Sequence, residues 1–186
     1  MEIKGTSVSN VISFVETNYT NKVELFKEKL PEKSRELYDN PVFSSNWYDL
    51  DDAYLNPILT IANVFYNNEK IKAANDVGKY SALRALKGVY KIFVQISSVD
   101  FVLKRATRIF STYYAEPAKI EVSEANKNNI VVTILGFDES QILIFDAISG
   151  WINGLMSIVS KREYFVDVKT KNENGSLIGI VNVKFV

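Results

Sequence analysis

The spacing of apolar residues changes from a helical to a strand-like period close to Pro117. Before this point, apolar residues recur three or four positions apart, as they do on one face of an amphipathic helix. Val8, Val11 and Val15 form such a face in the first segment. Together with capping residues and prolines at helix starts, this spacing predicts helices at 6–18, 20–30 and 31–39, from Asp51 or Asp52 to about 66, at 75–96 and at 98–114.

After Pro117 the apolar residues are mostly valine and isoleucine, and they partly alternate with polar residues over short stretches. This period is typical of β-strands, and it predicts strands at 120–123, 129–137, 163–170 and 177–185. A long helix at 140–160 separates the two pairs of strands. We therefore expect an α+β fold in one domain, residues 1–186, in which a mainly helical half, residues 1–116, packs on a small antiparallel sheet formed within 117–186.

The predicted helix at 140–160 contains Gly150 and Gly154, one turn apart, with Trp151 between them. Glycine costs about 1 kcal/mol relative to alanine inside a helix, so either another backbone comes very close there or the segment lies in a membrane. Asp146 and Asn153 stand at the centre of the apolar stretch, and a charge at mid-bilayer is costly. We expect a buried amphipathic helix that closely approaches the sheet or another helix, and no membrane span.

The composition removes most of the usual catalytic and metal-binding chemistry. The 186 residues include no cysteine and no histidine, which excludes disulfides, thiolate nucleophiles, serine–histidine–acid triads, zinc fingers and histidine-ligated haem. Lysine and arginine total 22, as do aspartate and glutamate, so no global positive field attracts nucleic acid. The absence of cysteine fits a reducing compartment, and the first residues lack the pattern of a signal peptide, so we expect a cytoplasmic protein.

A set of glycine and aromatic residues, spread over most of the chain, resembles the pattern of a known superfamily. These residues are Trp47, Tyr48, Gly78, Gly88, Tyr90, Tyr113, Tyr114, Gly136, Phe137, Gly150, Trp151 and Gly154. Together with the order of helices and strands, they resemble the haem-nitric-oxide-binding (H-NOX) and 4-vinyl-reductase-like superfamily, and most closely its bacterial members. The resemblance implies a sensor or binding domain whose helices and sheet enclose a cavity for a hydrophobic or planar ligand.

The best-known cofactors of this superfamily find no matching ligands in the chain. H-NOX proteins hold haem iron through a histidine and clamp the haem propionates with a Tyr-x-Ser-x-Arg motif, and this chain has no histidine. Its nearest string, from Tyr80 to Arg84, has another spacing and another place in the chain. Relatives that bind zinc use cysteine, which is also absent. The resemblance therefore implies a haem-less relative, and we predict no cofactor.

Clusters of charged residues offer further candidates. Asp49, Asp51 and Asp52 could bind a cation, but they lack the ligand pattern of a calcium loop, and helix capping explains them as well. Two basic groups could bind a phosphate or carboxylate or simply face solvent: Lys79, Arg84 and Lys87, and Lys104, Arg105 and Arg108. We predict no catalytic residue and no metal site.

Aromatic residues are the most suggestive candidates for a binding site. The chain has 11 phenylalanine, 10 tyrosine and 2 tryptophan residues, and ligand pockets are mostly apolar with a few placed polar groups. Tyr66, Phe93 and Tyr114 could face a pocket, and any of the aromatic residues could equally fill the core. As the wall of a ligand pocket we predict Trp47, Tyr48, Tyr80, Tyr90, Tyr113, Phe137 and Trp151.

These observations favour a non-enzymatic small-molecule-binding or signalling module with an apolar, aromatic-lined cavity. Any signal would pass through a protein partner or a homodimer. The main alternative is an interaction or scaffold protein with a filled core and no ligand, and an enzyme that uses carboxylates and tyrosines is a third hypothesis. A sensor predicts a connected cavity of roughly a few hundred Å³, a scaffold predicts an exposed apolar patch, and an enzyme predicts a cleft with converging ionisable groups.

Overall fold

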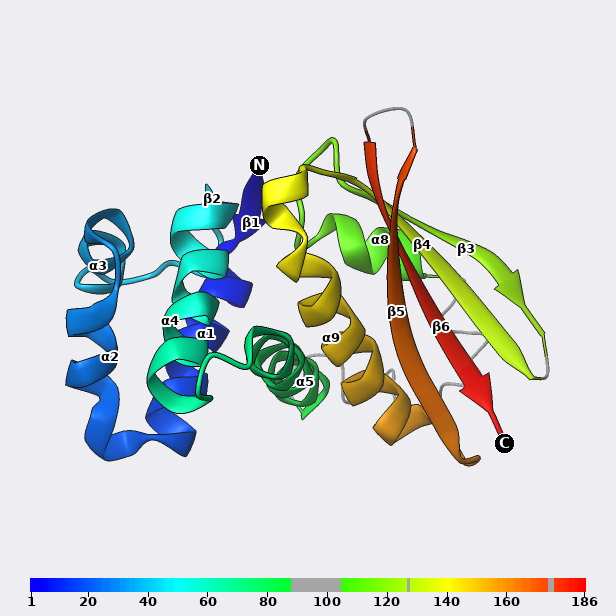
Figure 1. Cartoon of the computed structure of the whole chain (residues 1–186), viewed down its shortest axis with the longest axis horizontal. Coiled ribbons are helices and arrows are strands. Elements are labelled where there is room, and N and C mark those ends of the chain that lie inside the picture. The colour runs from blue at the N-terminus through cyan, green and yellow to red at the C-terminus, as the bar shows by residue number, and fades with distance from the viewer. Residues whose placement is uncertain (88–104, 127, 174–175) are drawn as a thin grey trace.

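The structure is a computed structural model that describes residues 1–87, 105–126, 128–173 and 176–186. Helices from the first half of the chain form one side of the molecule, a four-stranded sheet forms the other, and helix α9 (Leu143–Val159) lies between them (Figure 1). This arrangement confirms the predicted α+β fold, with a long helix between two pairs of strands.

The four-stranded sheet is antiparallel throughout, in the order β3-β4-β6-β5. On β4, the alternate residues Ile130, Val132 and Ile134 are buried, because successive side chains of a strand point to opposite faces. The sheet therefore has an apolar face against which helices pack. Each strand overlaps a predicted one: β3 (Lys119–Ala125), β4 (Asn129–Phe137), β5 (Tyr164–Glu173) and β6 (Ser176–Phe185).

The helical half follows the predicted pattern with shifted boundaries. α5 begins earlier than predicted, because Asn67 and Asn68 take positive φ angles of 51° and 66°, which asparagine tolerates, and so end the preceding helix in a short turn. The predicted helices at 75–96 and 98–114 extend into residues outside the described ranges. The elements are α1 (Gly5–Asn18), the 3-10 turn η1 (Thr20–Lys22), α2 (Val23–Lys29), α3 (Glu32–Tyr38), the π-helical turn η2 (Asp51–Leu55), α4 (Asn56–Phe65), α5 (Lys70–Lys87) and α8 (Ala106–Ser111).

A small two-stranded sheet, which the sequence pattern did not predict, joins the first residues to the segment before η2. β1 (Glu2–Lys4) pairs antiparallel with β2 (Trp47–Asp49). Strands this short show too little alternation to be recognised from sequence. Asp49, rather than Asp51 or Asp52, accepts the hydrogen bonds at the start of the following helical turn, since the backbone amides of Asp51 and Asp52 each donate to Asp49 Oδ1 at 3.0 Å.

The two glycines of α9 lie where this helix packs against α5. A methyl group on Gly150 would collide with the backbone of Asn75, and one on Gly154 would lie 2.8 Å from the Cβ of Ala82. Some of the polar side of α9 therefore contacts a helix instead of solvent, and Ser149 is buried with Gly150. Close backbone approach explains both glycines. Among the described helices, none combines the length and the apolar character that a membrane span requires.

On its other side, α9 contributes to the main core between helices and sheet. Ile144 and Phe145 are fully buried, as is Val181 of β6. The ring of Phe145 lies edge-on to that of Phe137 at 5.7 Å, and any side chain at Gly179 would collide with the Phe145 ring. α9 is thus closely packed on two sides, and one of its faces forms a wall of a cavity.

Candidate functional site

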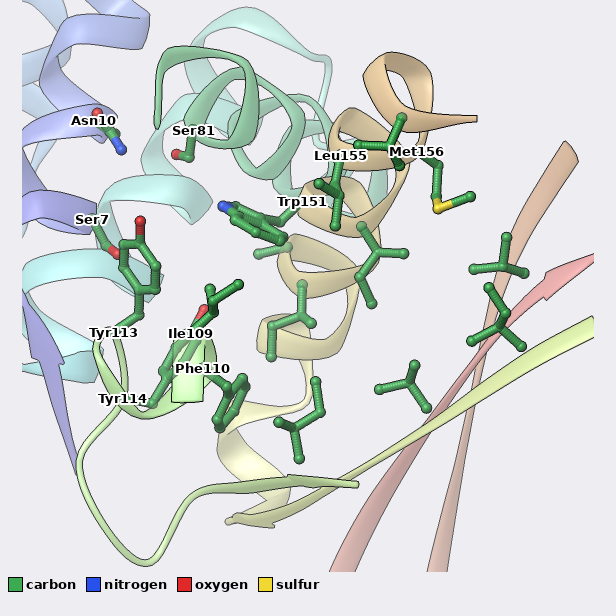
Figure 2. Close-up of a pocket in the computed structure, with 18 of the residues that line it drawn as sticks. Ser7, Asn10, Ser81, Ile109, Phe110, Tyr113, Tyr114, Trp151, Leu155 and Met156 are labelled. Atoms are coloured by element: carbon green, nitrogen blue, oxygen red, sulfur yellow. The ribbon is translucent and has the colours of Figure 1, made fainter. Parts of the chain in front are cut away.

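A cavity of about 90 Å³ lies between α9, the sheet and the helical half (Figure 2). This volume corresponds to about three water-sized groups of 30 Å³, whereas most ligand pockets measure about 300–1,000 Å³. The cavity is therefore smaller than the space of a few hundred Å³ expected for a sensor. Its wall includes large side chains, among them Phe110, Trp151 and Met156.

Apolar side chains form most of the described wall. The strands contribute Ile120, Ile130, Val132 and Val183. One face of α9 lines the cavity, because residues three or four positions apart lie on the same side of a helix. This face includes Ile148, Trp151, Ile152, Leu155, Met156 and Val159. The described wall contains no charged side chain. Because a buried ion without a partner is costly, this wall suits a neutral occupant.

Aromatic rings reach the cavity from α8 and from the turn that follows it (Figure 2). The rings of Phe110 and Tyr114 stack with their centroids 4.6 Å apart. The ring of Tyr113 lies 6.3 Å from that of Trp151. Burial raises the pKa of Tyr114 well above its usual value, so this hydroxyl stays neutral at physiological pH.

The N-terminal strand holds the turn that carries these tyrosines. The backbone amide of Lys4 donates to the carbonyl oxygen of Tyr113 at 2.8 Å, and the amide of Ala115 donates to the carbonyl oxygen of Glu2 at 3.0 Å. β1 therefore bonds to β2 and also to this turn. The unexpected small sheet thus positions one wall of the cavity.

Polar groups gather at the end of the cavity that faces α1 and α5. Ser7 and Asn10 come from α1 and Ser81 comes from α5, and all three are buried. Figure 2 shows the hydroxyl groups of Tyr113 and Ser81 and the indole nitrogen of Trp151 turned toward the same space. Within the portion of the chain that the structure describes, Ser81 Oγ has no hydrogen-bond partner.

Tyr54 also reaches the cavity, from the π-helical turn η2. π-helical turns are rare in proteins, and many of those that do occur lie at functional sites. Tyr54 is buried, and the burial raises the pKa of its hydroxyl far above the usual value. Like Tyr114, it therefore offers a neutral hydroxyl and no phenolate.

The structure brings together some of the predicted pocket residues and separates others. Tyr113 and Trp151 line the cavity, as does Tyr114. Phe137 lies in the core, with its ring edge-on to Tyr114 at 5.7 Å. Tyr80 points away from the described wall, and its hydroxyl donates to the Ser13 carbonyl oxygen at 3.1 Å. Aromatic character alone therefore does not place a residue in the cavity wall.

The remaining predicted wall residues lie elsewhere. Trp47 is exposed on β2, where the Lys4 ammonium group lies 4.4 Å from its ring centroid. The hydroxyl of Tyr48 accepts a hydrogen bond from the Phe43 amide at 2.8 Å. Neither residue belongs to the described cavity wall. Tyr90 lies outside the described residues, as does Phe93, while Tyr66 donates its hydroxyl to Asp76 at 3.0 Å.

Sequence reasoning missed the polar residues of the wall. Ser7 and Asn10 stand three positions apart and Phe14 follows four positions later, so these polar residues fall within an apolar helix face. Ser81 similarly lies between Val77 and Ala85, at helical spacing. Buried polar residues within an apolar face are a signal that could have pointed to this site.

The described members of the charged clusters do not belong to the described cavity wall. Asp49 accepts backbone hydrogen bonds as described above, and Asp51 Oδ2 accepts one from Gln141 Nε2 at 3.1 Å. Asp52 lies 3.8 Å from the Lys33 ammonium group. Within the described ranges, no group of three or more acidic residues is arranged to hold a metal ion. Of the basic residues, Lys104 lies outside the described ranges, Lys79, Arg84, Arg105 and Arg108 are exposed, and none of these four lines the described wall.

Comparison of the sequence found no matching protein-family model and no matching curated protein. Solved structures match over 98% of the chain. An H-NOX structure concerned with haem distortion has a TM-score of 0.74 and 17% identity, and 94% of that chain is covered. A mutant of the T. tengcongensis H-NOX has a TM-score of 0.71 and 15% identity, with 97% covered. An oxygen-binding H-NOX domain related to soluble guanylate cyclases has a TM-score of 0.71 and 14% identity, with 94% covered.

These matches extend over nearly the full length of both chains in each comparison, although few residues are identical. What the proteins share is the overall arrangement of helices and sheet. The resemblance inferred from the glycine and aromatic residues is thereby confirmed at the level of the fold. This chain has the H-NOX fold.

Proposed function

We propose that this protein is a non-enzymatic small-molecule-binding or sensory module that uses the cavity beside α9 and has no histidine-ligated haem. The observation that carries the proposal is the cavity of about 90 Å³ with its apolar and aromatic wall. An atom or molecule that fills the cavity gains dispersion contacts with this wall. The fold shared with an oxygen-binding H-NOX domain supports a sensory or ligand-binding module. We also propose a cytoplasmic location, which a chain without cysteine fits.

The described residues around the cavity do not fit haem. The chain has no histidine, and the described wall has no lysine or arginine to pair with the propionates. A tyrosinate could ligate iron, but burial raises the pKa of Tyr54 and of Tyr114 and so opposes the charged form. A space for about three water-sized groups is also far smaller than a porphyrin. These features support a haem-less module.

The size of the cavity limits the affinity of its occupant. The best small ligands gain about 1.5 kcal/mol per heavy atom, so an occupant of about four heavy atoms reaches about 6 kcal/mol, or a Kd of roughly 40 μM. Binding of this strength is reversible and exchanges rapidly. It suits the sensing of an abundant small molecule, with the signal passed to a protein partner or a second copy.

Unfolding in urea under xenon tests this proposal, because xenon is apolar, neutral and small enough for such a cavity. We expect xenon, compared with argon at the same pressure, to raise the free energy of unfolding by RT ln(1 + [Xe]/Kd). Ala147→Leu adds carbon atoms to the cavity wall, and we expect it to abolish this effect. Ala125→Leu adds the same atoms at an exposed position on β3 and serves as the matched control. An equal effect of xenon on both variants would contradict binding in the cavity.

A titration with haemin tests whether the module is haem-less. We expect no stoichiometric complex and no sharp Soret band from an axial protein ligand. A tight complex at one haem per chain would refute this element of the proposal.

A further inference from the structure

The two ends of the cavity differ in chemistry. At the sheet end, Ile120, Ile130 and Val132 present only aliphatic groups. At the end near α1 and α5, Asn10, Ser81 and Trp151 bring polar atoms (Figure 2). A purely apolar occupant would leave these polar atoms facing hydrocarbon, which is costly for a buried polar group. The cavity is thus divided into an apolar end and a polar end.

Ser81 is the residue of this polar end that most needs a partner. Hydroxyl groups within helices usually donate to a carbonyl oxygen of the preceding turn, as Thr60 does to Asn56 at 3.0 Å and Ser157 does to Gly154 at 2.7 Å. Ser81 is only 5% exposed, yet its hydroxyl has no partner among the described residues. Buried polar groups are rarely left unpaired, so this hydroxyl is available to a molecule in the cavity.

The types of polar atom restrict what that molecule can carry. A serine hydroxyl both donates and accepts, an asparagine amide does the same, and an indole N–H only donates. A hydroxyl or carbonyl oxygen complements all three groups. A carboxylate or an ammonium group would meet no opposite charge in the described wall, and its burial would be costly.

Resting on the function proposed above, we infer that the cavity selects a neutral molecule of a few heavy atoms with one hydroxyl or carbonyl group. The oxygen of this group is bound by the Ser81 hydroxyl, and the apolar portion lies toward Ile130 and Val132 of β4. Short-chain alcohols, ketones and aldehydes are the class of ligand that fits. The oxygen sets the orientation of the ligand, and the aliphatic end of the cavity sets its length.

Acetone and isobutene are matched probes for this inference. They have the same shape, but acetone has a carbonyl oxygen where isobutene has a methylene group. The protein contains two tryptophans, so the indole N–H signals in a ¹H–¹⁵N spectrum report on Trp151 in the cavity and on the exposed Trp47 as an internal reference. Trp47→Phe assigns the signals. We expect each probe to shift the Trp151 signal in a saturable way and to leave the Trp47 signal in place.

Three variants then separate the role of the hydroxyl from that of the cavity. We expect Ser81→Ala to weaken acetone binding by roughly 2- to 10-fold, as for the loss of one hydrogen bond, without weakening isobutene binding. Ser81→Thr keeps the hydroxyl and should retain acetone binding. Ser34→Ala removes the other buried serine hydroxyl without a partner in the described chain, and it should change neither affinity because Ser34 does not belong to the described wall.

The outcomes distinguish this inference from the function on which it rests. If Ser81→Ala affects both probes equally or affects neither, the selection of a polar group is overturned, while saturable isobutene binding upholds the cavity as a binding site. If neither probe shifts Trp151 in the unmodified protein, both the inference and the proposed function fail.

Discussion

The ring of Tyr113 lies 6.3 Å from the ring of Trp151, and the two ring planes are inclined by 57°. Trp151 belongs to α9, whereas Tyr113 lies in the turn that bonds to β1. Both rings face the cavity. A molecule in the cavity would therefore contact both the helix that packs on the sheet and the segment tied to the first strand.

Removal of the Tyr113 ring should enlarge the cavity enough to admit benzene. We expect Tyr113→Ala to lower the free energy of unfolding by about 2 kcal/mol, below the full cost for a completely buried ring because Tyr113 is partly exposed. Benzene should restore some of this loss, as it does in other apolar cavities of suitable size. Urea unfolding with and without benzene measures both effects. Tyr48→Ala is the control, since it truncates a partly buried tyrosine away from the cavity. If benzene stabilised Tyr48→Ala as much as Tyr113→Ala, the cavity would have no role in benzene binding.

Replacement of Ser81 by alanine should make the ligand-free protein more stable. Alanine has the better helix propensity, and the change removes a buried hydroxyl that has no partner in the described chain. We expect the free energy of unfolding to rise by about 0.5–1 kcal/mol for Ser81→Ala, and by a similar amount for Ser34→Ala. Chemical denaturation in the absence of added ligand measures both. A loss of stability in Ser81→Ala would mean that its hydroxyl already has a partner in the folded protein.

The close contact of α9 with α5 should not tolerate a side chain at Gly150. A methyl group there would meet the backbone of Asn75, and backbone atoms cannot move aside cheaply. We expect Gly150→Ala to lower the free energy of unfolding by about 1–3 kcal/mol, although alanine has the better helix propensity. Ser157→Ala, at an exposed position of the same helix, should cause no such loss. Equal stabilities of the two variants would refute the close packing of these helices.

The pH dependence of stability should contain a contribution from Asp146. Burial raises the pKa of this carboxyl group from 3.8 to about 6, so between these values the folded protein holds a proton that the unfolded chain has lost. The wild-type protein should therefore lose stability relative to Asp146→Asn as the pH rises from 3.8 to about 6, and the difference should stay constant above that range. Urea unfolding of both proteins at a series of pH values measures the difference. A difference that does not change with pH would mean that Asp146 titrates alike in both states.

The sequence predicted well those elements whose signal is local. β4 covers residues 129–137, the predicted range, because valine and isoleucine are frequent in this stretch. α9 required only its apolar spacing and its two glycines, and the reason for the glycines was also inferred correctly. By contrast, β1 and β2 depend on a pairing between distant segments, which no local pattern reveals.

The candidate site was harder to predict than the fold. Residue type alone does not show which side of an element an aromatic ring faces, so Phe137 and Tyr80 were as good candidates for the cavity wall as Trp151. Phe137 instead lies in the core, and the Tyr80 hydroxyl donates to α1. The polar end of the cavity contains Ser7 of α1 and Ser81 of α5, and only tertiary packing brings these two helices together.

A crystal structure determined under xenon pressure would test the central claim most directly. We expect a xenon atom in the cavity, in contact with Phe110, Val132 and Trp151. Absence of xenon from this space, or its presence only at exposed apolar side chains such as Phe165, would contradict the claim that the cavity beside α9 is a binding site.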